Sequence, residues 1–534
     1  MDGPQREPWA DATPLRAVSL CLVRPPAVTA PRSLSYYGAV PELGLAYVAA
    51  AARQAGHRVQ VVDGPGEALD HGWPLVTAAG VLRAHGLPPA AIVARIAPGT
   101  EVIGVANMFL HEWPTTRALL EAIRVAHPRA LLIAGGENAS AMAHELLAQC
   151  AALDAVVRGE GERPIVALLA QVAAGAPLGE LPGVVRRGGR QRPAPRIERI
   201  DALPWPAWDL FPIAHYLSHG SRGGVDRGPS MPLLTSRGCP YRCSFCSSPT
   251  MWGTRYVRRD PAGVLDEIAD LQRRYGITNV DLHDLTAMLT KAWIVEFCDA
   301  IAQRGLRFTW QLPSGTRSEA IDEAVARRMV AAGCRNFCYA PESGSPAELA
   351  RMRKRVVPER LLRSLRGAIA AGMVTHASII IGMPEQTAAD VRATAGFIAK
   401  MAWAGLHTLS VMVFSPYPGS EAYAQALSRG QLVRDEAWIY GSLLRSRGGG
   451  RNTRGVHPRW SPRRLLALQL GLLVGFFAIS WARHPRRAPA SLLAVLRGRQ
   501  DTVLEQLAAT KLTAARAWAR ERFTAVLRSL RPAS

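Results

Sequence analysis

Residues 235–249 read TSRGCPYRCSFCSSP and place Cys239, Cys243 and Cys246 on one short segment. Three residues separate the first two thiols, two separate the last two, and Phe245 directly precedes the third. Zinc sites built from cysteines usually need four ligands that arrive as two separated pairs, and no fourth Cys or His lies nearby at such a spacing. Three thiolates instead suit a cubane iron–sulfur (4Fe-4S) cluster whose fourth iron stays open for an exogenous ligand.

Length and composition indicate a globular protein of several domains. The chain has 534 residues, 48% of them hydrophobic and 20% charged, which is too long for one core. Its net charge of +22 would suit nucleic acid or an anionic membrane, but arginine spread along the whole chain supplies the excess, so we expect no nucleic-acid partner. Eight cysteines are too few for a disulfide framework, and the N-terminus lacks a signal-peptide pattern, so a cytoplasmic protein is expected.

The first third of the chain predicts a Rossmann-like domain. Strand-like and helix-like segments alternate over residues 15–185, which favours a doubly wound parallel sheet. Sheets of this kind bind ligands at the carboxyl ends of their strands, where GGENAS (135–140) and RGEGE (158–162) lie. A segment rich in proline, glycine and arginine follows at 186–230 and is interpreted as a linker.

Residues 231–430 predict a second α/β domain. Six strand-like segments alternate with helices, as in a partial (β/α)6 TIM-type barrel, whose working face is built from the loops that follow the strands. The cysteine segment falls directly after the first strand, on that face. Cys334 and Cys338 have no third thiol nearby, so we interpret them as buried packing rather than a second cluster.

The last part of the chain, 431–534, is expected to be helical. Within it, residues 465–482 are apolar apart from Gln469 and Ser480, and arginines flank the run on both sides. This barely reaches the length of a membrane-spanning helix. A buried helix, peripheral membrane contact and a true span all stay open.

The cysteine segment resembles the start of the catalytic core in radical S-adenosylmethionine (radical SAM) enzymes. It is most similar to the class that carries a cobalamin-binding-type domain in front. The later strand motifs of that class are similar to DLHDLT (281–286), RNFCYAPESGS (335–345), IIIGMPEQT (379–387) and VMVFSPYPGSEAY (411–423). Counted with the leading domain, the resemblance covers residues 15–430.

The resemblance implies two cofactors and a reaction type. In such enzymes the open iron chelates SAM, and an electron then cleaves it to methionine and a 5′-deoxyadenosyl radical. The electron comes from a donor such as flavodoxin or ferredoxin. The implied cluster ligands are Cys239, Cys243 and Cys246, and the implied SAM-binding residues are Phe245, Asp284, Arg317, Glu342, Ser343, Gly382 and Met383. At Gly382 and Met383, a backbone poor in side chains would let adenine approach closely.

The sequence of the first domain bears on whether cobalamin is a cofactor. Many cobalamin domains supply a histidine to the cobalt from a loop after the first strand, but residues 24–44, RPPAVTAPRSLSYYGAVPELG, contain none. Histidine ligation from this loop is therefore excluded. Several methylases of the class bind cobalamin without that histidine, so two alternatives stay open: a bound corrin, or a Rossmann-like domain that only shapes the substrate pocket.

Four functions fit these features to different degrees. The first is a cobalamin-dependent C-methyltransferase acting on a small or lipid-like biosynthetic metabolite, and the second is an oxidative cyclase or rearrangement enzyme. A non-catalytic iron–sulfur or cobalamin sensor would not need the SAM-binding motifs. An RNA-modifying methylthiotransferase would carry a β-barrel tail, whereas the tail of this chain reads as helical.

Overall fold

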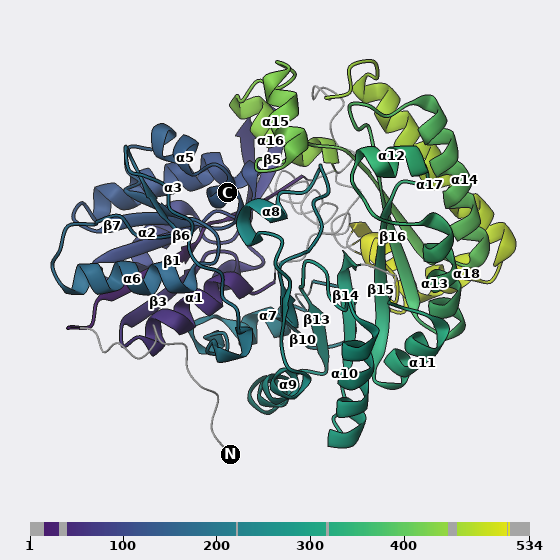
Figure 1. Ribbon diagram of the computed structural model, residues 1–534, viewed down its shortest axis with the longest axis horizontal. Helices are drawn as coiled ribbons and strands as arrows, with labels where there is room; N and C mark the ends of the chain where they lie inside the picture. The colour runs from purple at the N-terminus through teal and green to yellow at the C-terminus, as the bar shows by residue number, and fades with distance from the viewer. Residues whose placement is uncertain are drawn as a thin grey trace, which may run out of the picture.

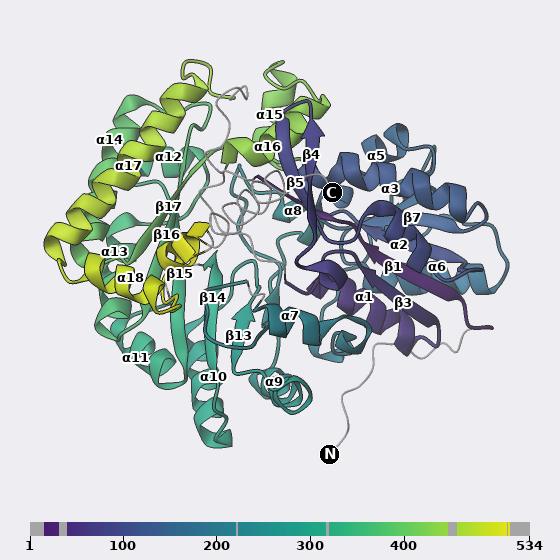
Figure 2. The ribbon, with the colours of Figure 1, turned by 180° about the vertical axis from the view of Figure 1, so that it is seen from behind.

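Two α/β halves lie side by side in the protein (Figure 1). The computed structural model describes residues 15–30, 40–220, 223–316, 320–446, 456–509 and 511–512. The N-terminal half holds one parallel sheet, the second half holds another, and helices from the C-terminal part run along the outer edge of the second half (Figures 1 and 2). The α/β fold class, the Rossmann-like sheet, the partial barrel and the helical C-terminal region are all confirmed.

The N-terminal sheet has the strand order β3-β1-β6-β7-β8-β9, in which only β9 runs antiparallel to its neighbour. Its strands are β1 (Ser19–Arg24), β3 (Arg58–Asp63), β6 (Val102–Ala106), β7 (Leu131–Gly135), β8 (Ala155–Val157) and β9 (Val184–Arg186). One face is covered by α1 (Leu43–Gln54) and α6 (Glu162–Ala173). The other is covered by α2 (Pro89–Arg95), α3 (Trp113–Ala126) and α5 (Ala143–Gln149). Because helices cover both faces, most positions of these strands are hydrophobic.

A three-stranded antiparallel sheet extends this half in a way that the sequence analysis did not anticipate. It pairs β2 (Ala27–Thr29) with a hairpin of β4 (Gly72–Thr77) and β5 (Gly80–His85). The hairpin turn lacks the usual Asn-Gly or Asp-Gly pair; Gly80 supplies the positive φ of 119°. Leu82 of β5 is buried with Tyr440 and Leu443 of α16 (Glu436–Ser446), so this small sheet contacts the C-terminal helices.

The segment predicted above as a linker, residues 186–230, connects the two halves and is called the strap below. Its described part contains α7 (Ile213–His219) and two short 3-10 turns. Ile197, Ile200 and Leu203 are buried with Tyr47 of α1, and Arg53 of the same helix forms an ion pair with Asp209. The strap therefore packs on the N-terminal half along much of its length.

The second half is an open six-stranded barrel. The strand order β10-β13-β14-β15-β16-β17 follows the sequence, and every pair is parallel. The strands are β10 (Ser230–Leu233), β13 (Asn279–Leu282), β14 (Thr309–Thr316), β15 (Cys334–Glu342), β16 (Val374–Ile381) and β17 (Thr408–Val413). The connecting helices are α9 (Pro261–Tyr275), α10 (Lys291–Arg304), α11 (Glu323–Ala331), α12 (Pro346–Arg351), α13 (Pro358–Ala370) and α14 (Ala388–Ala404), and α15 (Glu421–Ser428) follows the last strand.

The apolar run at 465–482 forms most of α17 (Pro462–Arg483), which is followed by α18 (Arg487–Leu496). Helix α17 packs against α14 and the edge strand β17 (Figure 2). Leu465, Gln469, Phe476 and Ser480 form its buried side, and Gln469 Nε2 donates to the Val411 carbonyl at 2.6 Å. Among the described residues it is the one helix long and apolar enough to cross a membrane, but one of its sides belongs to the barrel.

Candidate functional site

The cluster loop, residues 238–247, directly follows β11 (Ser236–Arg237), which pairs antiparallel with β12 (Val257–Arg258) further along the chain. Asp284, at the end of β13, fixes its start. The carboxylate of Asp284 accepts hydrogen bonds from the Thr235 amide at 3.1 Å, from the Thr235 hydroxyl at 2.8 Å and from the Ser236 hydroxyl. Asp284 is 3% exposed, and burial raises its pKa. The structure therefore uses this carboxylate to position the loop.

The far end of the loop is anchored by its backbone. The amide of Ser244 donates to the Met352 carbonyl at 2.9 Å, and the Ser244 carbonyl accepts from the Ala422 amide at 2.8 Å. The amide of Cys246 donates to the Cys243 carbonyl at 3.1 Å, which closes a turn between two of the cysteines. The loop is thus held by α12 and α15 as well as by Asp284.

Cys239, Cys243 and Cys246 are all half-buried thiols outside any disulfide. Burial raises the pKa of the Cys243 thiol to about 11, against the opposite influence of the nearby Lys354. Within the described ranges no three His, Cys, Asp or Glu side chains converge on the position of a single metal ion. Three thiols on one anchored turn are instead the donor set of an iron–sulfur cluster, and binding to iron would deprotonate them.

Glu342 ends β15 in a strained conformation, with φ of 64°. Residues other than glycine avoid this left-handed region, and such strain is concentrated at functional sites. Its carboxylate forms an ion pair of 3.0 Å with Lys354, and each of the two side chains is 9% exposed. The ammonium of Lys354 lies 5.9 Å from the centre of the Phe245 ring. Lys354 therefore connects Glu342 to the cluster loop.

The Ser343 side chain points into the protein interior. Its hydroxyl donates to Glu348 at 2.6 Å and lies 3.0 Å from the Thr394 hydroxyl. The hydroxyl also accepts from the Ser345 amide at 3.0 Å. The Ser343 hydroxyl thus supports the turn after β15, and a SAM contact at Ser343 stays a prediction. Arg317 lies outside the described residues.

Gly382 and Met383 follow β16. Gly382 has φ of 83°, and its amide donates to the Gln386 side chain at 2.7 Å. A Cβ at Gly382 would lie 3.0 Å from Leu465 of α17, so this helix already occupies the space beside the glycine. Met383 is buried in the hydrophobic core at the junction of the two halves. A close approach of adenine to these two residues stays a prediction.

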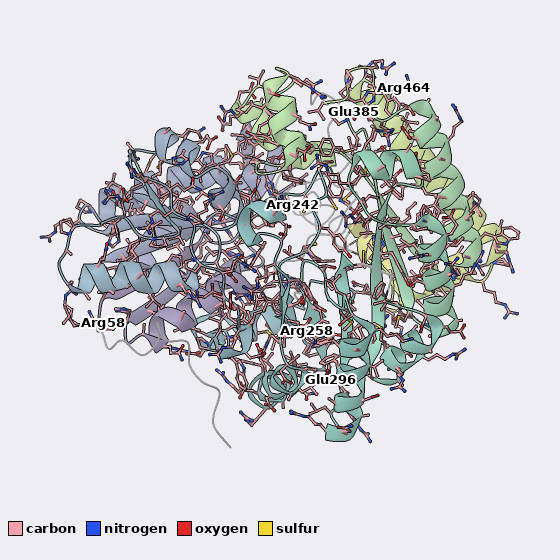
Figure 3. The ribbon with its side chains drawn as sticks, viewed as in Figure 1. Arg58, Arg242, Arg258, Glu296, Glu385 and Arg464 are labelled. Carbon is pink, nitrogen blue, oxygen red and sulfur yellow. The ribbon has the colours of Figure 1, made fainter. Side chains whose placement is uncertain are left out.

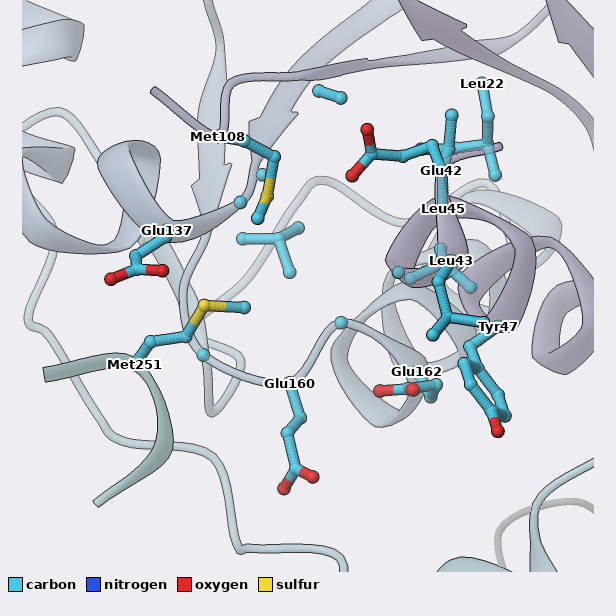
Figure 4. A pocket seen from close by; sticks show the side chains of 18 of the residues that line it. Leu22, Glu42, Leu43, Leu45, Tyr47, Met108, Glu137, Glu160, Glu162 and Met251 are labelled. Carbon is cyan, nitrogen blue, oxygen red and sulfur yellow. The ribbon is translucent and has the colours of Figure 1, made fainter. Parts of the chain in front are cut away.

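A cavity of about 490 Å³ lies where the two halves meet. From the N-terminal half it is lined by the strand ends and α1, and from the second half by Arg237, Gly238, Met251 and Trp252. In Figure 4, Met108 and Met251 lie on one side of the cavity, and Leu43, Leu45 and Tyr47 lie on the other. This volume is within the usual range for a bound cofactor.

The wall of the cavity suits a large, flat ligand with amide groups. At the strand ends the cavity is lined by backbone without side chains, at Gly104, Gly135, Gly136 and Gly159. A Cβ at Gly104 would lie 2.9 Å from Leu22. Carboxylates supply much of the polar lining, at Glu42, Glu137, Glu160 and Glu162. The residues present therefore fit the apolar face and amide side chains of a corrin.

Arg237 joins the two halves beside this cavity. Its guanidinium contacts Glu160 at 3.2 Å and Glu162 at 2.7 Å, and all three side chains are at most 4% exposed. Burial alone would lower the pKa of Arg237, but the charges of Glu162 and Glu160 outweigh it and raise the pKa. The guanidinium also lies over the ring of Tyr47, 4.7 Å from its centre. A second link runs from the Ser247 hydroxyl of the cluster loop to Glu137.

The two cysteines of β15 are packing residues, as expected. Cys334 and Cys338 lie on β15, and both are buried. Burial raises the pKa of both thiols. Neither lies on the cluster loop.

Two family models match the chain. The radical SAM superfamily matches residues 233–398, and the B12 binding domain matches residues 32–169. The first range contains the cluster loop and most of the barrel. The second contains most of the N-terminal sheet and most of its share of the cavity lining.

Several characterised or named proteins are similar over much of the chain. An uncharacterized methyltransferase of Pyrococcus horikoshii is 29% identical, with 78% of this chain and 85% of the relative aligned. The cytidylyl-2-hydroxyethylphosphonate methyltransferase of Streptomyces wedmorensis is 26% identical, over 74% of this chain and 79% of the relative. The anaerobic magnesium-protoporphyrin IX monomethyl ester cyclase of a Synechocystis strain is 29% identical, over 43% of this chain and 46% of the relative.

The fold is shared with a solved structure. The radical S-adenosylmethionine methyltransferase TsrM from Kitasatospora setae, solved with cobalamin and a [4Fe-4S] cluster, superposes with a TM-score of 0.62. It is 19% identical, and the alignment covers 87% of this chain and 89% of that one. The two-domain arrangement is therefore common to both proteins.

We predict a pH dependence of stability that originates at Glu348. Burial raises its pKa to about 7, against the lowering effect of the Ser343 hydrogen bond. The folded state then binds more protons than the unfolded chain between about pH 4 and 7, so Glu348 makes stability fall as the pH rises through that window. In Glu348→Gln, the urea midpoint should decline less between pH 5 and 8. Glu359→Gln, at an exposed acid of α13, is the control, and equal pH slopes in parent and Glu348→Gln would contradict the assignment.

Proposed function

Because this chain is a radical SAM enzyme with an N-terminal B12-binding domain, we propose that it methylates a carbon atom of a biosynthetic metabolite. It acts on a small molecule and requires a reductant. The observation that carries the proposal is the cavity at the strand ends of the N-terminal half, which is lined by Arg237 and Gly238 at the start of the cluster loop. The two cofactor sites therefore adjoin.

The cofactors of the chain are a 4Fe-4S cluster, SAM and cobalamin. When bound, the cluster and SAM supply a 5′-deoxyadenosyl radical, and cobalamin supplies a methyl group. The proposed cluster ligands are Cys239, Cys243 and Cys246. Asp284 holds the start of their loop, and Glu342 with Lys354 is proposed to hold polar groups of SAM at the end of β15. The buried junction around Arg237 would keep water away from the radical.

Oxidative cyclisation is the second candidate. The cyclase relative has the same kind of core, but its similarity covers 43% of this chain. The two methyltransferase relatives match 78% and 74% of it, including most of the N-terminal half. The greater coverage favours methyl transfer, and the appearance of a methyl group from labelled SAM in the product distinguishes the two reactions.

The cluster assignment predicts the behaviour of Cys243→Ala. Loss of one thiolate should remove the cluster, so that reconstituted protein loses its iron and SAM cleavage falls at least 100-fold. The measurement is 5′-deoxyadenosine formation under anaerobic conditions, next to an iron assay. Cys338→Ala, which removes a buried thiol outside the loop, should keep both. If Cys243→Ala cleaves SAM as well as the parent, the mechanism is wrong.

The cobalamin assignment predicts the effect of filling the cavity. Gly135 lines it with ordinary backbone angles, and a Cβ there would meet nothing closer than 3.7 Å. In Gly135→Leu the new side chain would occupy the cavity and should weaken hydroxocobalamin binding at least 10-fold, as measured from the corrin absorption spectrum. Gly396→Leu adds the same side chain on the exposed side of α14 and should bind normally. Equal binding by both variants would place the corrin elsewhere.

The exposed side of α17 is proposed to make a peripheral membrane contact. Leu470, Val474 and Trp481 of α17 are 44%, 67% and 41% exposed, and α18 exposes Leu492 and Leu496. Residues 457–500 contain eight arginines and no Asp or Glu. Apolar residues flanked by arginines are typical of helices that lie on anionic lipid.

Vesicle sedimentation tests this contact. The parent should bind vesicles that contain phosphatidylglycerol, bind pure phosphatidylcholine weakly, and be released by salt. Val474→Glu should reduce binding at least fivefold, whereas Val76→Glu, at a position 81% exposed on β4, should not. No binding to anionic vesicles, or binding that resists salt, would refute peripheral contact.

A further inference from the structure

The cluster loop has a second, outward-facing side. A hollow of about 910 Å³ lies between residues 240–242 of the loop and the segment 346–359, which includes α12 and the start of α13. It shares no lining residue with the cavity at the junction of the two halves. The loop thus separates one hollow from the other, and cysteines flank residues 240–242 on both sides.

This hollow is strongly basic. Arg242, Arg353, Lys354 and Arg355 line it, and Glu359 is the one acid in its lining. The three arginines are exposed, and Arg242 lies near the junction of the two halves in Figure 3. Arg353 forms an ion pair with Glu421, and Lys354 forms one with Glu342. When these acids and Glu359 are counted against the four basic side chains, an excess of positive charge is left. Such a surface attracts acidic partners over several ångströms of water and increases their rate of association.

The basic residues are held rigidly with respect to the cysteines. The Lys354 amide donates to the Leu349 carbonyl at 2.9 Å, and the Lys354 carbonyl accepts from the Val356 amide at 2.8 Å. The neighbouring Met352 carbonyl accepts from Ser244 of the cluster loop. Lys354 itself reaches inward to Glu342. The backbone that carries Lys354 and its arginine neighbours is therefore held in place before any partner arrives, which lowers the entropic cost of binding.

We propose that this hollow is the docking surface for an acidic electron-transfer protein. The inference rests on the proposed function, because a reduced cluster is what that function requires. Electron transfer weakens steeply with distance, so the donor must approach the cysteines closely, and the outer side of their own loop provides that approach. Val357, which is 48% exposed beside the arginines, offers an apolar contact within a basic surround, and electron-transfer complexes need only small interfaces.

The step at this surface is a single electron transfer. One electron leaves the reduced flavin or iron–sulfur centre of the donor and enters the oxidised cluster, so that the donor is oxidised and the cluster is reduced by one electron. No covalent bond forms or breaks between the two proteins. The surface has only to bring the centres together and to release the oxidised donor.

Charge reversal on the outer side of the loop tests the proposal. The variant Arg242→Glu/Arg355→Glu keeps Arg353, which is paired with Glu421, and keeps Lys354. The control Arg58→Glu/Arg129→Glu changes the net charge equally at exposed positions of the N-terminal half. Each protein is assayed anaerobically for 5′-deoxyadenosine with two reductants, reduced flavodoxin and reduced methyl viologen, a small cation that needs no basic docking surface.

We expect kcat/KM for flavodoxin to fall at least 10-fold in Arg242→Glu/Arg355→Glu, while the methyl viologen rate stays within twofold of the parent. The control should behave as the parent with both reductants. The flavodoxin rate of the parent should fall with added salt more steeply than that of the variant. The milder Arg242→Gln/Arg355→Gln should show a smaller loss in the same direction if folding of the reversed variant is impaired.

Other outcomes distinguish failure of the docking surface from failure of the proposed function. Equal loss with both reductants would mean that the arginines serve the cluster or an anionic substrate, and would overturn the docking surface. An unchanged flavodoxin rate would overturn it as well. If the parent fails to cleave SAM even with methyl viologen, the proposed function fails, whatever the arginines do.

Discussion

The guanidinium of Arg237 lies between two carboxylates of the other half of the protein, and the site depends on this contact. Arg237 directly precedes the cluster loop, whereas Glu160 lies between β8 and α6 and Glu162 begins α6 in the N-terminal half. At such burial, removing one partner would leave an unpaired charge at a cost of several kcal/mol, so these ion pairs fix how the two halves meet. The cavity beside Arg237 has walls from both halves and exists only while they stay together.

Several weaker contacts preserve the same junction. The strap buries Ile197 and Ile200 beside Tyr47, the hairpin of β4 and β5 packs on α16, and Ser247 donates to Glu137. The residues that form these contacts come from positions far apart in the sequence, so no single segment holds the two halves together alone. A rigid junction of this kind fixes the distance between the two cofactor sites, which suits chemistry that passes a reactive group between them.

The sequence reveals the parts of this protein whose signal is local. Thiol spacing identifies the cluster loop, and the alternation of strands and helices predicts both sheets. The features that the sequence does not reveal depend on contacts between residues that are far apart in the sequence and close only in the fold. The orientation of the Ser343 hydroxyl depends on Glu348 and Thr394, and Asp284 acts on a loop that precedes it by almost fifty residues. Apolar residues occur around the whole circumference of α17, so its composition does not show which side packs against the barrel. In the structure, the side that carries Gln469 does so, because Gln469 donates a hydrogen bond to the Val411 carbonyl.

The two sides of the cluster loop differ in a way that matches the demands of radical chemistry. Toward the N-terminal half the loop faces a largely apolar cavity with buried ion pairs beside it. On the outside it faces a basic, accessible hollow. A radical must be kept from water and from other proteins, whereas an electron must be delivered by a protein that comes and goes. One loop can satisfy both demands only if it is thin and rigid. The hydrogen bonds donated to the Asp284 carboxylate at one end and to the Met352 carbonyl at the other supply that rigidity.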